Sequence, residues 1–443
     1  MWFNTARIMM VRLLILSIVF ILHNAGLRAQ VPVPGKALKG TVLLKNGIAH
    51  LGNGEVINAS AVAFKDGKLS LVADATIIKL NPNEFDTIIN LNGKHIYPGF
   101  IAPNSTLGLY EIDAVRATRD GNETGEINPN VRSIIAYNTE SRITPTVRSN
   151  GVLIAQITPR GGLISGSSSI VTLDAWNWED AVVTMDDGIH LNWPVIRYHR
   201  RKPKPGSTPP HKQFERKREV LRSFFEKAQA YNKGTYSSTD LKLKSMAGLF
   251  DGSKTLYIHV QGAKGISQAI EFSKEFAVNK MVIVGGRESW MVLDLLHKNN
   301  IPVILHRIHS LPTRYDDPID LPYRLPKILH DAGILFCLEN SGDMERMGAR
   351  NLPFYAGTAA AYGLSKEDAI QSITYNTAQI LGLEESMGSL EVGKDATLFV
   401  STGDALDMRT NNVELAFIKG RVVDMDNHQK ALYRKYRAKY KDQ

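Results

Sequence analysis

The chain has 443 residues, of which 43% are hydrophobic and 22% are charged. This is the composition of an ordinary globular protein, with enough length for a large core and for two domains. The formal net charge is +9, and much of it lies in residues 197–222 and in the tail from Lys430. We interpret these segments as a solvated insertion and a charged terminal helix.

The first 29 residues differ from the rest of the chain. Arg7 and Arg12 precede a run that is almost wholly apolar at 13–22, and Ala29 is a small residue before Gln30. This pattern predicts a secretory signal, residues 1–29, that is cleaved after Ala29. The run is shorter than the ~20 residues of a membrane span, although an uncleaved anchor is the alternative.

Export has consequences for compartment and partners. We expect an exported protein, periplasmic or secreted, with no membrane contact after signal cleavage and no nucleic-acid partner. The only cysteine, Cys337, lies far from the predicted cleavage site. A lipid anchor on a cysteine just after cleavage and an intramolecular disulfide are therefore both excluded.

Residues 38–97 predict short strands, because apolar and polar residues alternate and turns are expected at Asn-Gly and Asp-Gly. From residue 98 onward, strand-like runs that are apolar throughout recur: YPGFI, GVLIAQI, LYIHV, MVIVGG, IPVIL and GILFCL. ISQAIEFSKEFAVN and SWMVLDLLHKNN, which lie between some of them, show helical spacing. This alternation predicts a parallel sheet with helices outside, in a β/α barrel.

Residues 388–425 return to short strands, and neither terminal β segment is large enough for a comfortable core. We therefore expect residues 30–97 and 388–425 to form one composite β domain beside a barrel of residues 98–387, followed by a basic tail, residues 426–443. Residues 203–217 are rich in Pro, Lys and Gly and predict a surface loop.

Three segments resemble the amidohydrolase superfamily, near its imidazolonepropionase-like branch. They are GKHIYPGFI (93–101), AIQSITYNTAQILGLEESMGSLEVGKDATLFV (369–400) and VELAFIKGRVV (413–423). The resemblance implies a (β/α)8 TIM-like barrel plus a β-sandwich domain built from both ends of the chain. It also implies hydrolysis of carbon–nitrogen bonds other than peptide bonds, often in cyclic amides.

The resemblance implies a metal held at the C-terminal ends of the barrel strands, but most of the usual ligands are missing. The two histidines expected after the first strand are replaced by Asn104 and Thr106, and a third falls on Gly285. His259 is the one ligand retained. The catalytic Asp expected after the last strand falls on Asn340 or Ser341, and Asp343 could serve only if the loop is shifted.

A relocated metal is the alternative. His259, His306 and His309 with Glu288 or Glu339 would give three imidazoles and a carboxylate. The cofactor expected is therefore one divalent metal, with zinc preferred, or none if the site is degenerate.

Two loops carry candidates for substrate binding. Arg160, Gly161, Gly162 and Ser165 follow the strand GVLIAQI, and their loop could present backbone N–H groups to an anion or a carbonyl oxygen. Glu123 and Arg132 follow the first barrel strand and could edge the barrel mouth. The alternatives are a long loop with glycine turns and a solvated loop.

Two functions stay open. One is a hydrolase acting on a small amide, cyclic amide or peptide-like ligand. The other is an inactive member that binds such a ligand or forms a complex with an active relative; a homodimer is also possible. Because both the expected metal ligands and the expected base are missing, chemistry alone favours the second function.

Overall fold

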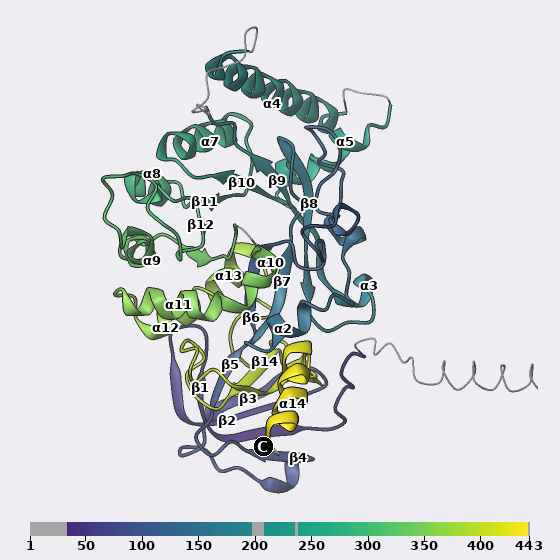
Figure 1. Cartoon of the computed structure of the whole chain (residues 1–443), viewed down its shortest axis with the longest axis vertical. Helices are drawn as coiled ribbons and strands as arrows, with labels where there is room; N and C mark the ends of the chain where they lie inside the picture. Colours follow the sequence, from purple (N-terminus) through teal and green to yellow (C-terminus); the bar gives the residue numbers. More distant parts are fainter. Residues whose placement is uncertain (1–32, 197–207, 235–237, 343, 442–443) are drawn as a thin grey trace, which may run out of the picture. The chain divides into compact units, whose positions relative to one another are not determined.

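The computed structural model describes residues 33–196, 208–234, 238–342 and 344–441, and residues 34–443 form one compact unit. The predicted signal at 1–29 lies outside the described residues. Two sheets organise the unit (Figure 1). None of the described helices combines the length and the apolarity needed to cross a membrane.

The first sheet is built from both ends of the chain, in the order β16-β15-β14-β5-β1-β2-β3, with β4 pairing with β1. Its strands are β1 (Val42–His50), β2 (Val56–Lys65), β3 (Lys68–Asp74), β4 (Thr87–Asn90), β5 (His95–Pro98), β14 (Leu398–Ser401), β15 (Val413–Ile418) and β16 (Arg421–Val422). Antiparallel pairing of β5 with β14 joins the N-terminal and C-terminal segments. The predicted pairing of these segments is therefore observed, whereas the predicted domain limits stay a prediction.

The Asn-Gly and Asp-Gly dipeptides of the predicted strand segments behave differently. Asp66 and Gly67 connect β2 to β3, with φ angles of 50° and 80°, as a two-residue hairpin requires. Asn46 and Gly47, in contrast, lie inside β1, where the pairing with β2 shifts register. Asn53 and Gly54 lie in the connection between β1 and β2, as the prediction of an Asn-Gly turn expects, whereas the extra residue at Asn46–Gly47 is accommodated as a bulge.

The second sheet is a nearly closed barrel in the order β13-β12-β11-β10-β9-β8-β7-β6. Its strands are β6 (Phe100–Ser105), β7 (Val152–Ile157), β8 (Ile164–Thr172), β9 (Val182–Asn192), β10 (Thr255–Val260), β11 (Met281–Gly285), β12 (Val303–Leu305) and β13 (Phe336–Leu338). Ser372 and Ile373 bridge its two edges, because their carbonyls accept from the amides of Leu338 (3.2 Å) and Ile101 (3.0 Å).

The barrel departs from the expected all-parallel arrangement. β8 runs antiparallel to both β7 and β9, whereas the other neighbouring strands are parallel. The segment predicted as a glycine-rich loop thus contains the buried strand β8. Only six residues, 158–163, connect β7 to β8, which is too short for a crossover between parallel strands and suits a hairpin.

Helices flank the barrel strands, with α7, α8, α9 and α11 on the outer side of β10–β13 (Figure 1). The helices are α2 (Thr144–Arg148), α3 (Trp178–Ala181), α4 (Pro210–Asn232), α5 (Leu241–Ser245), α6 (Ala247–Asp251), α7 (Ala263–Glu275), α8 (Leu293–Lys298), α9 (Leu321–Asp331), α10 (Glu345–Gly348), α11 (Leu352–Ala361), α12 (Lys366–Gln371), α13 (Tyr375–Leu381) and α14 (His428–Lys441). Short 3-10 turns are η1 (Pro82–Glu84), η2 (Arg116–Thr118), η3 (Ser133–Ala136), η4 (Ser289–Met291) and η5 (Ala349–Asn351).

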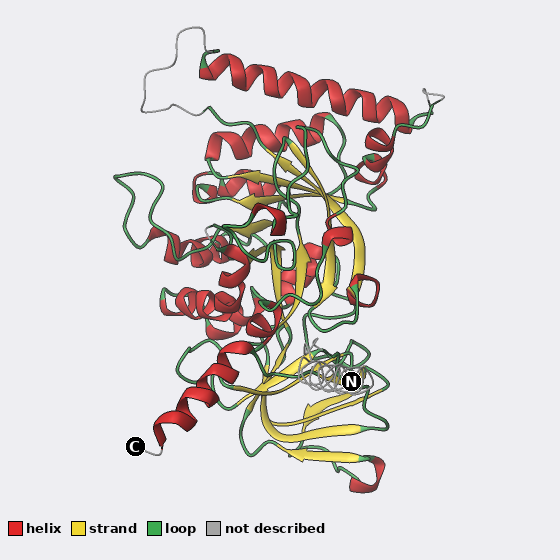
Figure 2. Cartoon of the chain, turned by 45° about the vertical axis from the view of Figure 1, so that its right-hand side comes forward, coloured by secondary structure: helices red, strands yellow, loops and turns green. Residues whose placement is uncertain are grey.

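The predicted surface loop at 203–217 needs correction. Helix α4 begins at Pro210, where a proline is tolerated because the first turn has no use for its N–H (Figure 2). Residues 203–207 lie outside the described residues. The tail forms the helix α14, which contributes no buried residue.

Candidate active site at the barrel mouth

The C-terminal ends of the barrel strands bring Asn104, His259 and Glu339 to one end of the barrel. A bulge in β6, where Asn104 has a φ of +49°, changes the direction of its side chain. Asparagine tolerates this left-handed conformation better than most residues. Parallel strands of such barrels present their functional groups at this end.

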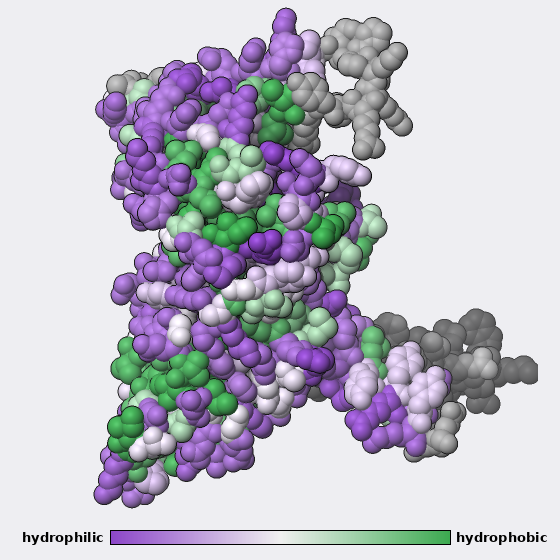
Figure 3. Space-filling model, turned by 90° about the vertical axis from the view of Figure 1, so that its left-hand side faces the viewer, coloured by the Kyte–Doolittle hydropathy of each residue, from purple (hydrophilic) through white to green (hydrophobic). Residues whose placement is uncertain are grey.

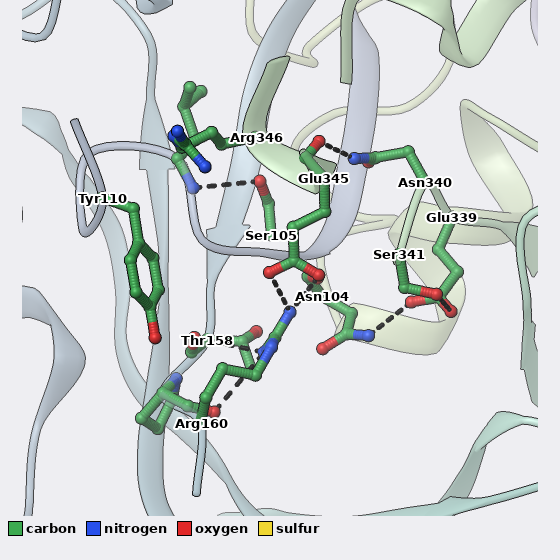
Figure 4. Close-up of polar contacts among 12 residues, drawn as sticks. Asn104, Ser105, Tyr110, Thr158, Arg160, Glu339, Asn340, Ser341, Glu345 and Arg346 are labelled. Atoms are coloured by element: carbon green, nitrogen blue, oxygen red, sulfur yellow. Dashed lines mark hydrogen bonds and ion pairs between the residues drawn. The ribbon is translucent and has the colours of Figure 1, made fainter. Parts of the chain in front are cut away.

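Glu339 follows β13 directly and is 1% exposed. Its carboxylate accepts hydrogen bonds from the Nδ2 of Asn104 and the Oγ of Ser341 (Figure 4). Burial raises the pKa of Glu339 to about 7, against the opposing effect of these hydrogen bonds. A carboxyl that titrates near neutrality can act as a general acid or base.

Glu339 occupies the position directly after β13. β13 ends at Leu338, so the first residue after the strand is Glu339 and not Asn340 or Ser341. The Nδ2 of Asn340 instead donates to the carbonyl of Glu345 at the start of α10. Asp343 lies outside the described residues.

His306 and Ser341 extend the group around Glu339. The Nδ1 of His306 lies 2.9 Å from the Oγ of Ser341 and 3.7 Å from the Oε1 of Glu339. Its Nε2 contacts a guanidinium nitrogen of Arg287. Burial, and then the cations of Arg287 and Arg307, lower the pKa of His306 to about 4, which keeps the ring neutral at neutral pH.

His259 has a partner that the sequence did not predict. Its Nε2 lies 2.9 Å from the Nδ1 of His190 in β9, and the ring of His190 stacks on Tyr257. Burial, followed by the charge of Arg160, lowers the pKa of His259 to about 3. The sequence alone did not identify His190, because it predicts no strand at 182–192, although apolar and polar residues alternate at the end of VVTMDDGIHLN.

A buried polar network connects the five strands β6 to β10 inside the barrel. The Oε1 of Gln156 accepts from the amide of Asn104 (3.0 Å), and its Nε2 donates to Asp187 (2.7 Å). Asp187 also accepts from the hydroxyls of Ser168 (2.7 Å) and Tyr257 (2.9 Å), while burial raises its pKa. Through Gln156, the network fixes the backbone of Asn104 relative to the neighbouring strands.

Among the predicted substrate-binding residues, Arg160 joins the site. Its Nη2 donates to the carbonyl of Asn104 (2.8 Å) and to the Oε1 of Glu345 (3.0 Å) (Figure 4). Arg132 instead pairs with Asp186 (2.7 Å). Glu123 accepts from the amide of Thr124 and lines a separate cavity of about 280 Å³.

Gly161 and Gly162 line a cavity near the end of β9, and Ser165 lies close to them in the chain. The carbonyls of Gly161 and Gly162 accept from the Nδ2 of Asn192, and Ser165 donates to Gly161 (2.6 Å). Gly161 and Gly162 line a cavity of about 390 Å³ together with Trp193. The loop is thus fixed through its carbonyls, whereas we expected its N–H groups to be the functional feature.

The donors at the barrel mouth do not fit the metal centre that the resemblance implies. Gly285 has a φ of +106° and no side chain to coordinate a metal, and the terminal amide of Gln261 lies 2.3 Å from the position that a Cβ there would occupy. Thr106 is buried just beyond β6. Arg160 and Arg287 add positive charge beside Asn104 and His306, which opposes a divalent cation.

The relocated metal set is not assembled either. His309 contacts Thr358 in α11 (2.7 Å), and Glu288 accepts from the amide of Ala263 and pairs with Arg314. Within the described ranges, no group of three His, Cys, Asp or Glu side chains is arranged to hold a metal ion.

Comparisons with known proteins agree with this architecture. Residues 325–423 match the model of the amidohydrolase family. An imidazolonepropionase from Flavobacterium psychrophilum is 23% identical over 193 residues, which cover 38% of this chain and 46% of that protein. The chain thus spans about half the length of this curated relative.

Solved structures cover more of the chain. An amidohydrolase from Thermotoga maritima MSB8 is 26% identical, with a TM-score of 0.74 over 86% of this chain and 99% of that one. A Xaa-Pro dipeptidase with bound methionine is 15% identical, with a TM-score of 0.55 over 87% of this chain and 100% of that one. The second likeness concerns the fold alone.

Proposed function

We propose that the chain is a member of the amidohydrolase superfamily that hydrolyses carbon–nitrogen bonds of small amide, cyclic amide or peptide-like compounds, with Glu339 as its acid–base group. The observation that carries this proposal is the buried carboxyl of Glu339 at the end of β13, hydrogen-bonded to Asn104. Its pKa of about 7 makes both protonation states available at neutral pH.

The chemistry follows from the weakness of amides as electrophiles. As a base, Glu339 can accept a proton from the attacking hydroxyl group. As an acid, it can return that proton to the leaving nitrogen, which would otherwise depart as an unstable anion. Because the donor set does not fit the family's metal centre, no step of the proposed reaction uses a metal.

A second candidate is an inactive member that binds a ligand at the barrel mouth. Among the described residues, the Oδ1 of Asn104 and the Nε of Arg307 are buried without a hydrogen-bond partner. Buried polar atoms are usually paired, so these two atoms support a bound ligand that would complete their hydrogen bonds.

The experiment is a hydrolysis screen of cyclic amides and dipeptides with the purified chain, Glu339→Gln and Glu414→Gln. Glu414 is the matched control, because it pairs with Lys94 in the first sheet, away from the barrel mouth. We expect Glu339→Gln to lower kcat roughly 10²-fold or more, whereas Glu414→Gln leaves it unchanged. Absence of turnover on every substrate, with saturable binding of one of them, would favour the inactive member.

Export and assembly are part of the proposal. The basic and apolar pattern at 1–29 supports export to the periplasm or the medium. Apolar side chains reach the surface between hydrophilic ones on the face that carries α8, α9 and α11 (Figure 3). Leu311, Tyr315 and Ile319, which are exposed in the loop before α9, support a homodimer or a complex with an active relative.

The first sheet would be a separate β-sandwich domain in this proposal. Its own apolar cluster, which includes Val42, Val62, Ile96, Leu398 and Phe417, supports that assignment.

A further inference from the structure

We propose that Ser341 is a nucleophile, activated by Glu339, that forms a covalent acyl intermediate at the barrel mouth. This inference rests on the proposed function, since it names the group that attacks the amide carbonyl. Ser341 has contacts of the kind that a nucleophilic hydroxyl needs: its Oγ touches the Oε1 of Glu339 and lies 2.9 Å from the Nδ1 of His306.

The direction of these hydrogen bonds is set by Arg287. A guanidinium can only donate, so the Nε2 of His306 accepts from Arg287 and the proton of the neutral ring lies on Nδ1. Nδ1–H then donates to the Oγ of Ser341, and the hydroxyl proton of Ser341 is directed at Glu339. Glu339 is therefore the base for Ser341, and His306 is a positioning residue.

The surroundings of Ser341 favour developing negative charge. Ser341 is partly exposed, which leaves its Oγ open to a substrate, whereas Glu339 is buried behind it. Arg307 lies beside the next residue, because its Nη2 is 3.2 Å from the position that a Cβ on Gly342 would occupy. Two guanidinium groups, those of Arg287 and Arg307, can thus stabilise an oxyanion formed at the attacked carbonyl.

The reaction balances with water as the only co-reactant. The Oγ of Ser341 bonds to the carbonyl carbon while its proton passes to Glu339. The carbon–nitrogen bond then breaks, and the nitrogen leaves with that proton. Water next attacks the ester, gives a proton to Glu339 and forms the acid, and Ser341 recovers its proton as the acyl–oxygen bond breaks.

The test treats the purified full chain with an alkyl fluorophosphonate and locates the adduct by peptide mass spectrometry, beside the amide screen above. We expect one adduct, on Ser341, with loss of fluoride. Ser341→Ala should abolish the adduct, and Glu339→Gln should slow its formation roughly 10²-fold. Ser310→Ala is the control, a serine in the loop after β12 that should label as wild type does. Far-ultraviolet circular dichroism checks that each variant folds.

The outcomes separate this inference from the proposed function. Hydrolysis that needs Glu339, without an adduct on Ser341, would overturn the nucleophile and leave the function standing. An adduct on Ser341 without hydrolysis of any amide would support the nucleophile and count against the proposed substrate class. Neither adduct nor hydrolysis would overturn both.

Discussion

The Nε2 of His259 lies 2.9 Å from the Nδ1 of His190, so the one histidine retained from the expected metal site is engaged by a neighbouring imidazole. One nitrogen of this contact must donate and the other accept, which requires that both rings be neutral or that only one be charged. Burial lowers the pKa of both rings, well below the usual value for His190 and to about 3 for His259.

The first prediction concerns acid stability. The unfolded imidazole of His259 gains a proton near its ordinary pKa of 6.5, whereas the folded ring stays neutral until about 3. The contribution of His259 to stability is therefore fully present above pH 6.5 and is lost as the pH falls from 6.5 toward 3. Between about pH 7 and about pH 5, we expect the free energy of unfolding of His259→Gln to fall by about 2 kcal/mol less than that of wild type, as measured by urea unfolding.

An equal loss in the two proteins would mean that His259 is protonated in the folded state. Nitrogen chemical shifts from NMR give an independent check, because neutral and charged imidazoles differ clearly. A charged His259 at pH 5 would contradict the paired arrangement.

Glu339 gives the opposite dependence on pH. Its folded pKa is about 7, compared with 4.5 for the ordinary carboxyl. The contribution of Glu339 to stability is therefore present below pH 4.5 and is lost as the pH rises toward 7. We expect the free energy of unfolding of Glu339→Gln to rise by about 3 kcal/mol relative to wild type between about pH 4.5 and about pH 8. Glu414→Gln should follow wild type at every pH, and parallel curves for all three proteins would mean that Glu339 titrates normally.

The third prediction is metal content. The purified chain, loaded with zinc, manganese or iron and freed of excess metal by gel filtration, should contain far less than one metal per chain by elemental analysis. The physical reason is the donor set, in which Gly285 offers no ligand side chain and Arg160 and Arg287 add positive charge. Near one metal per chain, lost in His259→Ala, would instead restore the metal-dependent hydrolase.

A fourth prediction concerns the buried ion pair between Arg148 and Asp174. Arg148, which is 4% exposed, donates to the carbonyl of Leu173 (2.9 Å) and to the carboxylate of Asp174. Arg148→Met should lower the free energy of unfolding by about 3 kcal/mol, because it leaves the buried charge of Asp174 without its cation. The exposed pair Arg409–Asp407 is the control, and Arg409→Met should cause no measurable change in chemical denaturation.

Local pattern predicted much of the fold. The apolar runs GVLIAQI, LYIHV and MVIVGG form β7, β10 and β11, because a strand that is buried on both faces must be apolar throughout. The Asp66–Gly67 turn is also local, since both residues need positive φ. The sequence did not predict β8, because the serines and the glycine in ISGSSSIVT are typical of a loop. Only the pairing with β7 and β9 makes this segment a strand.

The sequence by itself determined that Asn104, Thr106 and Gly285 stand where the resemblance implies metal ligands. Only the tertiary structure decided which side chains meet at the barrel mouth. Glu339, Asn104, Ser341 and His306 come from three strands or the loops after them, and pairing across the barrel brought them together. Burial, which no single segment encodes, then raised the pKa of Glu339 and lowered that of His259, because removal of water disfavours the charged form of each group.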